Sequence, residues 1–409
     1  MVSMVACFKI AADLWGDQGF GEWALARRLL SFSLPLVICG LDIAIPRYVA
    51  IAGRAQAGLA AAAVMSGALL FTAASVTVVV TLALATRSEI AGLLFGDPRY
   101  ASLVVPLCLL IPGYSLHILA YAYLRGSLRI AEANLLHVLT HGVLPLAVLA
   151  TNPSVPEQAF WRLGALVTAL GVFAAVYAFR RSGLDPAAAP RSSRLLAAYG
   201  LQRMLAAFGL LLLATLPGVV AANQAGVAQA GYVVLGLSFI GLAGSAAAPL
   251  GVTILPLASG LIAEGRPAAL RGLYRRLQWI ILAGSVAAPG IVWPLAPAIT
   301  ALFLGGRNEE ATIILRICAV GAGPSFYFSC MRNFVDANTE TGLNTRNLLI
   351  ALLAFGAVAT LGMLGLGAAA ARVAASSYVA ALFVLAVLTW RATAKLFSAR
   401  DPAHAQLLP

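Results

Sequence analysis

Twelve apolar stretches follow one another along this chain, and short connections between them hold most of its charged residues. They cover roughly residues 1–14, 23–49, 59–86, 101–124, 133–151, 159–179, 199–222, 230–262, 277–303, 311–331, 347–367 and 370–390. A membrane-spanning helix needs about 20 mainly apolar residues, and every stretch except the first is long enough. Charged residues are only 10% of the 409, against about 25% in soluble domains. The sequence therefore predicts an all-α polytopic membrane protein with about twelve transmembrane helices.

The first apolar stretch is too short to cross a bilayer. It contains Lys9 and Asp13 and ends at Trp15, with no small-residue cleavage site of the kind that ends a signal peptide. We expect either a partial span or a chain whose start codon was assigned downstream of the true one.

Basic residues gather in alternate connections, such as Arg125 and Arg129 after the fourth stretch and Arg180 and Arg181 after the sixth. Cytoplasmic loops of polytopic proteins carry an excess of Lys and Arg. The pattern predicts that both termini are cytoplasmic. It also explains the net charge of +12 without nucleic acid as a partner.

The longest polar connection lies near the middle of the chain and reads RRSGLDPAAAPRSSR. It predicts an N-terminal six-helix lobe (1–180), a cytoplasmic linker (181–194) and a C-terminal six-helix lobe (195–409). The segments Gly21–Pro46 and Gly231–Pro256 have equal lengths and similar proline-containing ends. Such repetition favours two pseudo-symmetric bundles around a central cavity.

Residues 266–278 place Leu270 and Tyr274 on the face opposite Arg271 and Arg275. This pattern is typical of an amphipathic helix lying on the anionic lipids of the inner leaflet. An ordinary basic cytoplasmic loop is the alternative.

The second stretch carries unusual charges: Arg27, Arg28, Asp42 and Arg47 lie within Gly21–Arg54. A charge near the centre of a membrane helix costs roughly 2.5–3.5 kcal/mol, so such side chains usually face protein or a watery cavity. Arg27 and Arg28 are about 100° apart on a helix, so we expect at least one to turn toward protein. Snorkelling of both to the interface is the alternative.

Asp42 lies within about 40° of the face of Arg28 on a continuous helix. It is a candidate for accepting a proton or a cation that drives transport, or else it pairs with a neighbouring arginine. Pro46 is a candidate hinge, or only a local break.

Further arginines lie at or inside the ends of other stretches. Arg203 and Arg316 are candidates for the cavity, and Arg162 and Arg372 are predicted at outer helix ends. The planar guanidinium group suits phosphate oxygens. Arg27, Arg28, Arg47, Arg203 and Arg316 are therefore the predicted substrate-binding residues, with Asp42 as the coupling residue.

Other motifs do not predict chemistry. His137 and His141 have the i, i+4 spacing of a metal pair but no intervening Glu and no obvious third ligand, which favours polar residues between helices. The five cysteines lie in apolar runs without a CxxC spacing. No catalytic triad or Walker motif is present, so we expect no enzyme, cofactor or metal site.

Two segments resemble a known family. Leu14 to Trp23 reads LWGDQGFGEW and Gly40 to Tyr48 reads GLDIAIPRY. They are similar to the first outer loop and the end of the second helix in polysaccharide and lipid-linked oligosaccharide flippases of the multidrug/oligosaccharidyl-lipid/polysaccharide exporter superfamily. The likeness extends to LRGSLRIAEANLL and RNFVDANTETGLNTRN after the fourth and tenth stretches.

The resemblance implies two six-helix bundles whose first, second, seventh and eighth helices line a cavity. It implies alternating-access transport of a polyprenyl-pyrophosphate-linked saccharide across the bacterial inner membrane, with a polysaccharide polymerase or glycosyltransferases as possible partners. One alternative is a multidrug cation antiporter of the same superfamily, which needs acidic groups inside its helices. The other is an inactive, truncated membrane protein, which the short first stretch favours.

Overall fold

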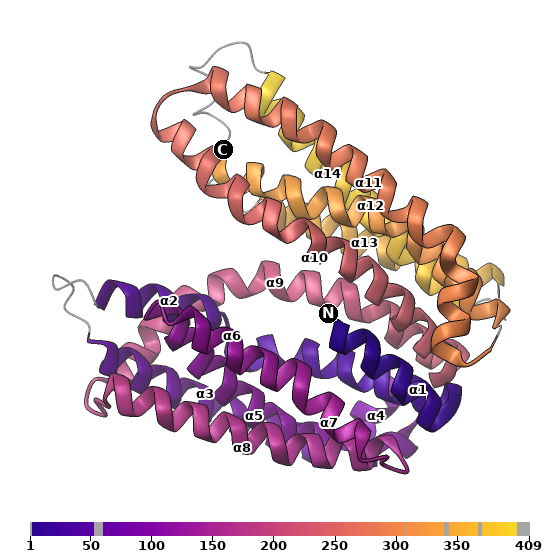
Figure 1. The fold of residues 1–409 in the computed structure, drawn as a ribbon, viewed down its shortest axis with the longest axis horizontal. Coiled ribbons are helices and arrows are strands. Elements are labelled where there is room, and N and C mark those ends of the chain that lie inside the picture. The colour runs from indigo at the N-terminus through magenta and orange to yellow at the C-terminus, as the bar shows by residue number, and fades with distance from the viewer. Residues whose placement is uncertain (1, 53–59, 307, 339–342, 367–369, 399–409) are drawn as a thin grey trace. The chain divides into compact units, whose positions relative to one another are not determined.

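The computed structural model describes residues 2–52, 60–306, 308–338, 343–366 and 370–398, and within them the chain is built of helices (Figure 1). The helices are α1 (Val2–Ile38), α2 (Leu41–Ala52), α3 (Ala61–Ala85), α4 (Arg87–Phe95), the 3₁₀ helix η1 (Pro98–Tyr100), α5 (Ala101–Gly126), α6 (Ile130–Val138), the π-helix η2 (Leu139–Val143), α7 (Leu144–Ala150), α8 (Pro156–Ser182), α9 (Ala189–Ala225), α10 (Val227–Ala263), α11 (Pro267–Leu304), α12 (Glu309–Asn338), α13 (Leu343–Leu366) and α14 (Ala370–Ser398).

The helix α1 is two helices joined at Gly16. This residue has φ 62° and ψ −168°, a conformation that glycine adopts readily because it has no Cβ. The part before Gly16 is shorter than the roughly 20 residues that a span requires. The short first stretch therefore forms a helix of less than membrane length.

A second break separates α1 from α2. Cys39 and Gly40 have φ values of 46° and 76°, and the two helices are bent by 48°. The prediction of one continuous helix over 23–49 with a hinge at Pro46 was wrong. Pro46 lies inside α2, and the bend falls at Gly40, where the left-handed conformation ends the α1 hydrogen-bond ladder.

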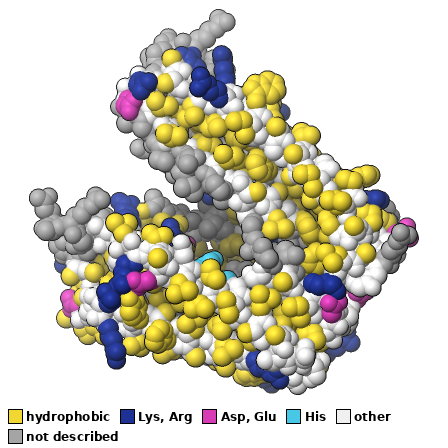
Figure 2. Space-filling view, in the orientation of Figure 1, with side chains coloured by type: hydrophobic (Ala, Val, Ile, Leu, Met, Phe, Trp, Pro, Cys, Tyr) yellow, Lys and Arg dark blue, Asp and Glu magenta, His cyan; other side chains and the backbone are white. Residues whose placement is uncertain are grey.

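Within the described residues, ten helices are long and apolar enough to cross a membrane, or eleven if the bent pair Ala6–Ile38 and Leu41–Ala50 is counted as one span. Apolar side chains cover much of the visible surface in Figure 2, and large ones such as Phe173, Trp279 and Leu364 are strongly exposed. A surface of this kind is stable in lipid rather than in water. The chain is a multi-pass membrane protein.

The amphipathic segment 266–278 is the beginning of α11, which continues to Leu304. Leu270 and Tyr274 are buried in a core cluster with Phe334, while Arg271 and Arg275 are exposed. The predicted two-faced pattern was therefore correct. Both predicted forms were wrong, however, because the segment is neither a loop nor a separate helix on lipid: its apolar face packs on α12.

The chain divides into two compact units. Unit 1 comprises Met1–Thr215 and Gly226–Ala228, and unit 2 comprises Leu216–Ala225 and Gln229–Pro409, considered over their described residues. In unit 1, α5 packs along α8, and in unit 2, α12 packs along α11 and α14.

The core of unit 1 around α1 is aromatic. Trp23 and Phe20 have no exposed surface, and the Trp23 ring stacks on Phe160 of α8 with centroids 4.6 Å apart. These contacts fix the second half of α1 against α8. They also place the residue one turn further along, Arg27, beside a fixed aromatic ring.

Candidate functional site

Arg27 lies half-buried in unit 1, with its Cζ atom 5.6 Å from the centroid of the Trp23 ring. Its Nη1 atom is buried and has no hydrogen-bond acceptor among the described residues. The Arg27 charge acts on the Cys7 thiol, on Tyr114 and on His141. Burying a guanidinium nitrogen without an acceptor is costly, so Nη1 of Arg27 is a candidate donor.

Arg28 is also half-buried, next to Arg27 on α1. Its Nε atom has almost no exposed surface. Both guanidinium groups therefore have atoms inside protein. The 100° separation of two adjacent helix positions predicted this for at least one of them.

Arg47 and Asp42 lie on α2 and are exposed. Arg47 donates from Nη1 to Tyr199 Oη at 2.6 Å, and its Cζ lies 4.7 Å from the centroid of that ring. Asp42 is in the first turn of α2 and interacts with the charge of Arg125. The predicted angular relation between Asp42 and Arg28 was wrong, because the break at Cys39 and Gly40 interrupts the helix between them.

The two remaining predicted arginines lie beyond the first helices. The side chain of Arg203, on α9, lies outside the described residues. Arg316 of α12 is half-buried in unit 2, where its Cζ atom is 4.8 Å from the centroid of Trp293 and its buried Nε has no hydrogen-bond partner within the described part of the chain. Each unit therefore contains a half-buried arginine beside a tryptophan.

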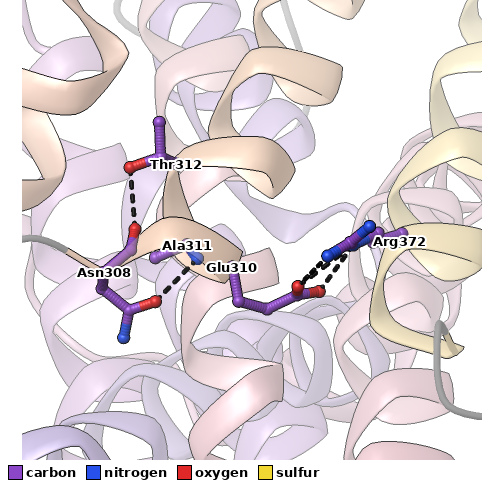
Figure 3. A network of polar contacts seen from close by, with 5 residues as sticks. All are labelled: Asn308, Glu310, Ala311, Thr312 and Arg372. Carbon is purple, nitrogen blue, oxygen red and sulfur yellow. Dashed lines mark hydrogen bonds and ion pairs between the residues drawn. The ribbon is translucent and has the colours of Figure 1, made fainter.

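Two other arginines that the sequence offered for an anionic headgroup already have partners in the chain. Arg372 of α14 forms a bidentate ion pair with Glu310 of α12, with Nε 2.9 Å from Oε1 and 3.0 Å from Oε2 (Figure 3). Arg162 donates to the Oγ1 atom of Thr151 at 2.5 Å. These contacts engage part of each guanidinium group within the chain.

A cluster of histidines was missed by sequence reasoning. His117 of α5 lies beside His137 of α6 and His141 of η2, and one ring nitrogen of each lies within 4.8 Å of the others. The i, i+4 pair was visible in the sequence, but its third member comes from another helix. Only packing of α6 and η2 on α5 brings His117 to the pair.

A pocket of about 490 Å³ lies at one end of unit 1, between α1, η1 and the start of α8. It is lined by Gln18, Glu22, Arg99, Tyr100, Ser102, Leu103, Val155, Pro156 and Glu157. Gln18 donates to Tyr100 Oη at 2.5 Å. The segment GDQGFGE therefore contributes to a polar pocket in addition to its turn at Gly16.

No protein-family model matches the chain, and no curated protein matches its sequence. Solved structures do match its fold. An inward-facing multidrug resistance MATE family transporter of the MOP superfamily aligns with a TM-score of 0.75 and 14% identity, over 97% of this chain and 96% of the transporter. The chain has the fold of that transporter.

Two further structures agree. The lipid II flippase MurJ, in an inward closed conformation, aligns with a TM-score of 0.69 and 13% identity, over 99% of this chain and 87% of the flippase. The Vibrio cholerae MATE transporter VcmN, in its bent form, gives a TM-score of 0.56 and 14% identity over 98% and 99% of the two chains. The predicted fold, a two-lobed bundle of about twelve helices, is confirmed. Identities of 13–14% establish a shared fold, and the transported substrate has to be argued from the side chains.

Proposed function

We propose that this protein moves an anionic, lipid-linked saccharide across a membrane by alternating access. The observation that carries the proposal is Arg27, a half-buried arginine with a buried nitrogen that has no acceptor among the described residues. A pyrophosphate group supplies the acceptor oxygens that this guanidinium group lacks. Arg28 follows it on α1, so a second positive charge lies near this position.

The sign of the charges favours this substrate over a cationic drug. A cation exporter needs carboxylates inside its helices to hold its substrate and exchange it for protons. Among the carboxylates of the described spans, Glu310 is occupied by Arg372 and Glu132 by Arg129 and Tyr177. Glu22 of α1 lines the pocket at one end of unit 1. Asp42 is exposed at the start of α2, a place better suited to coupling than to binding a large cation.

The proposal also specifies the substrate, the membrane, the orientation of the chain and its partners. The substrate is a polyprenyl-pyrophosphate-linked saccharide in a bacterial inner membrane, both termini are cytoplasmic, and a polysaccharide polymerase or glycosyltransferases act on the same lipid. The saccharide moves from the inner leaflet, where it is linked to its lipid, to the outer leaflet.

The test uses the full chain reconstituted in vesicles that contain a fluorescent polyprenyl-pyrophosphate monosaccharide. Replacing Arg27 and Arg28 together by Ala should lower the flipping rate by at least about tenfold, since even one lost charge-assisted hydrogen bond costs about 1.5–3 kcal/mol. Arg87→Ala is the matched control, because Arg87 is an exposed arginine of the same unit. Equal rates in the double variant and the wild type would refute the assignment, and export of an organic cation with no lipid flipping would favour a multidrug antiporter.

A further inference from the structure

We propose that His117, His137 and His141 bind one divalent transition-metal ion of the Zn²⁺ class inside unit 1. The three residues lie on α5, α6 and η2, and their ligand nitrogens are within 4.8 Å of one another. This site is separate from the proposed transport of a lipid, and it is defined by binding alone.

The geometry is close to that of a three-histidine metal site. Nitrogen–zinc bonds of about 2.0–2.1 Å place tetrahedral ligand nitrogens about 3.3 Å apart. The exposed His137 is the ligand whose side-chain rotation can close the present spacing. The ring centroids of His137 and His141 are already 4.5 Å apart.

A hydrogen bond to Thr140 orients the ring of His117. The hydroxyl group of Thr140 donates to the carbonyl oxygen of Leu136 at 2.9 Å, and its Oγ1 atom lies 3.0 Å from Nδ1 of His117. Since a hydroxyl group has one proton, a Thr140 hydroxyl that donates to Leu136 can only accept from His117, and in that arrangement Nδ1 carries the proton. The lone pair of His117 is then on Nε2, and metal-ligating histidines are usually oriented by this kind of second hydrogen bond.

The local backbone also points to a site. The residues Leu139–Val143, which include His141, form a π-helical turn between α6 and α7. Such turns are rare, and they occur frequently at functional positions. Here the wider turn carries His141 toward His117, with centroids 5.2 Å apart, and stacks it on Tyr114, also at 5.2 Å.

The ligand set selects the class of metal. Imidazole nitrogens suit Zn²⁺, Cu²⁺ and Ni²⁺ rather than Mg²⁺ or Ca²⁺, which prefer oxygen. Three protein ligands leave one coordination position open. His137 is exposed in unit 1, so an ion can reach this ligand from outside.

Arg27 opposes the bound cation, because its charge acts on His141. Like charges repel more strongly away from bulk water. The proposal therefore predicts changes of opposite sign: removing a histidine weakens metal binding, whereas removing the Arg27 charge strengthens it.

The experiment measures Zn²⁺ binding to the full chain, purified in detergent with an affinity tag that contains no histidine, by competition with a chromophoric chelator. One Zn²⁺ per chain is expected. His137→Ala and His141→Ala should each lower the affinity about a hundredfold, and Thr140→Val about tenfold through the lost orienting bond. Arg27→Ala should raise the affinity several-fold.

Co²⁺ supplies a second readout, because its visible absorption reports nitrogen ligation directly. The matched controls are His404→Ala, which alters the remaining histidine of the sequence, and Cys7→Ala, which removes a soft ligand close to Arg27. Both should bind Zn²⁺ like the wild type. His137→Ala keeps the test decisive if the buried His117 cannot be replaced without loss of folding. Equal Zn²⁺ affinity in the wild type and in His137→Ala, or no nitrogen-ligated Co²⁺ spectrum in the wild type, would overturn the site.

Discussion

Gly40 and Gly200 are in direct backbone contact. A Cβ atom placed on Gly200 would lie 2.1 Å from the carbonyl oxygen of Cys39, and one placed on Gly40 would lie 2.6 Å from the carbonyl oxygen of Gly200. The break between α1 and α2 is therefore pressed against α9, and neither position has room for a side chain.

This contact predicts that Gly200→Ala destabilises the protein by about 1–3 kcal/mol, the usual cost of overpacking. Thermal unfolding of the detergent-solubilised chain measures the change. Gly356→Ala is the control, because nothing lies within 4 Å of a Cβ at that helical position and Ala is the better helix former by up to about 1 kcal/mol. A Gly200→Ala protein as stable as the Gly356→Ala protein would contradict the close contact.

The stacking of Trp23 on Phe160 predicts that Trp23→Ala and Trp161→Ala differ in stability. Trp23→Ala should cost about 3–5 kcal/mol, since the side chain is fully buried. Trp161→Ala removes a tryptophan that is 42% exposed on α8, directly after Phe160, and should cost far less. Unfolding midpoints and the yield of monodisperse protein compare the two. Similar losses in both variants would mean that the aromatic core around α1 contributes little.

The ion pair between Glu310 and Arg372 predicts a charge-reversal rescue. Glu310→Arg and Arg372→Glu should each lower the unfolding midpoint, because each places two like charges together between α12 and α14. The double variant should recover most of the loss. Reversal of the exposed pair Glu264 and Arg266 serves as the control and should have little effect. A double variant no more stable than the single variants would show that the pair does not join the helices.

Replacing Asp42 should change the coupling of transport to an ion gradient without a loss of substrate binding. Under the proposed function, Asp42→Asn should make lipid flipping independent of an imposed proton or sodium gradient, while half-saturation by the lipid stays unchanged. The vesicle assay with and without a gradient measures both quantities. Asp97→Asn is the control, since Asp97 caps η1 and contacts Arg99. A variant that keeps the gradient dependence of the wild type would exclude Asp42 from coupling.

The helices were predictable from the sequence, because a run of apolar residues long enough for a bilayer can satisfy its backbone only as a helix. The short first helix and the two-faced start of α11 followed from the same reasoning. The break at Gly40 did not. Glycine is common along this chain, and only the structure shows that this one has a left-handed conformation and packs against Gly200 of α9.

The candidate site residues also divide into features that the sequence predicted and features that only the structure revealed. The sequence by itself determined which helices carry charge, since charged residues in apolar runs are evident from their neighbours. Only the tertiary structure decided which charges are compensated: Glu310 neutralises Arg372 across 62 positions, whereas Arg27 meets an aromatic ring. It also decided that His117 joins a pair 20 or more positions away. Helical periodicity relates residues within one turn or two, whereas partners on different helices are set by how those helices pack.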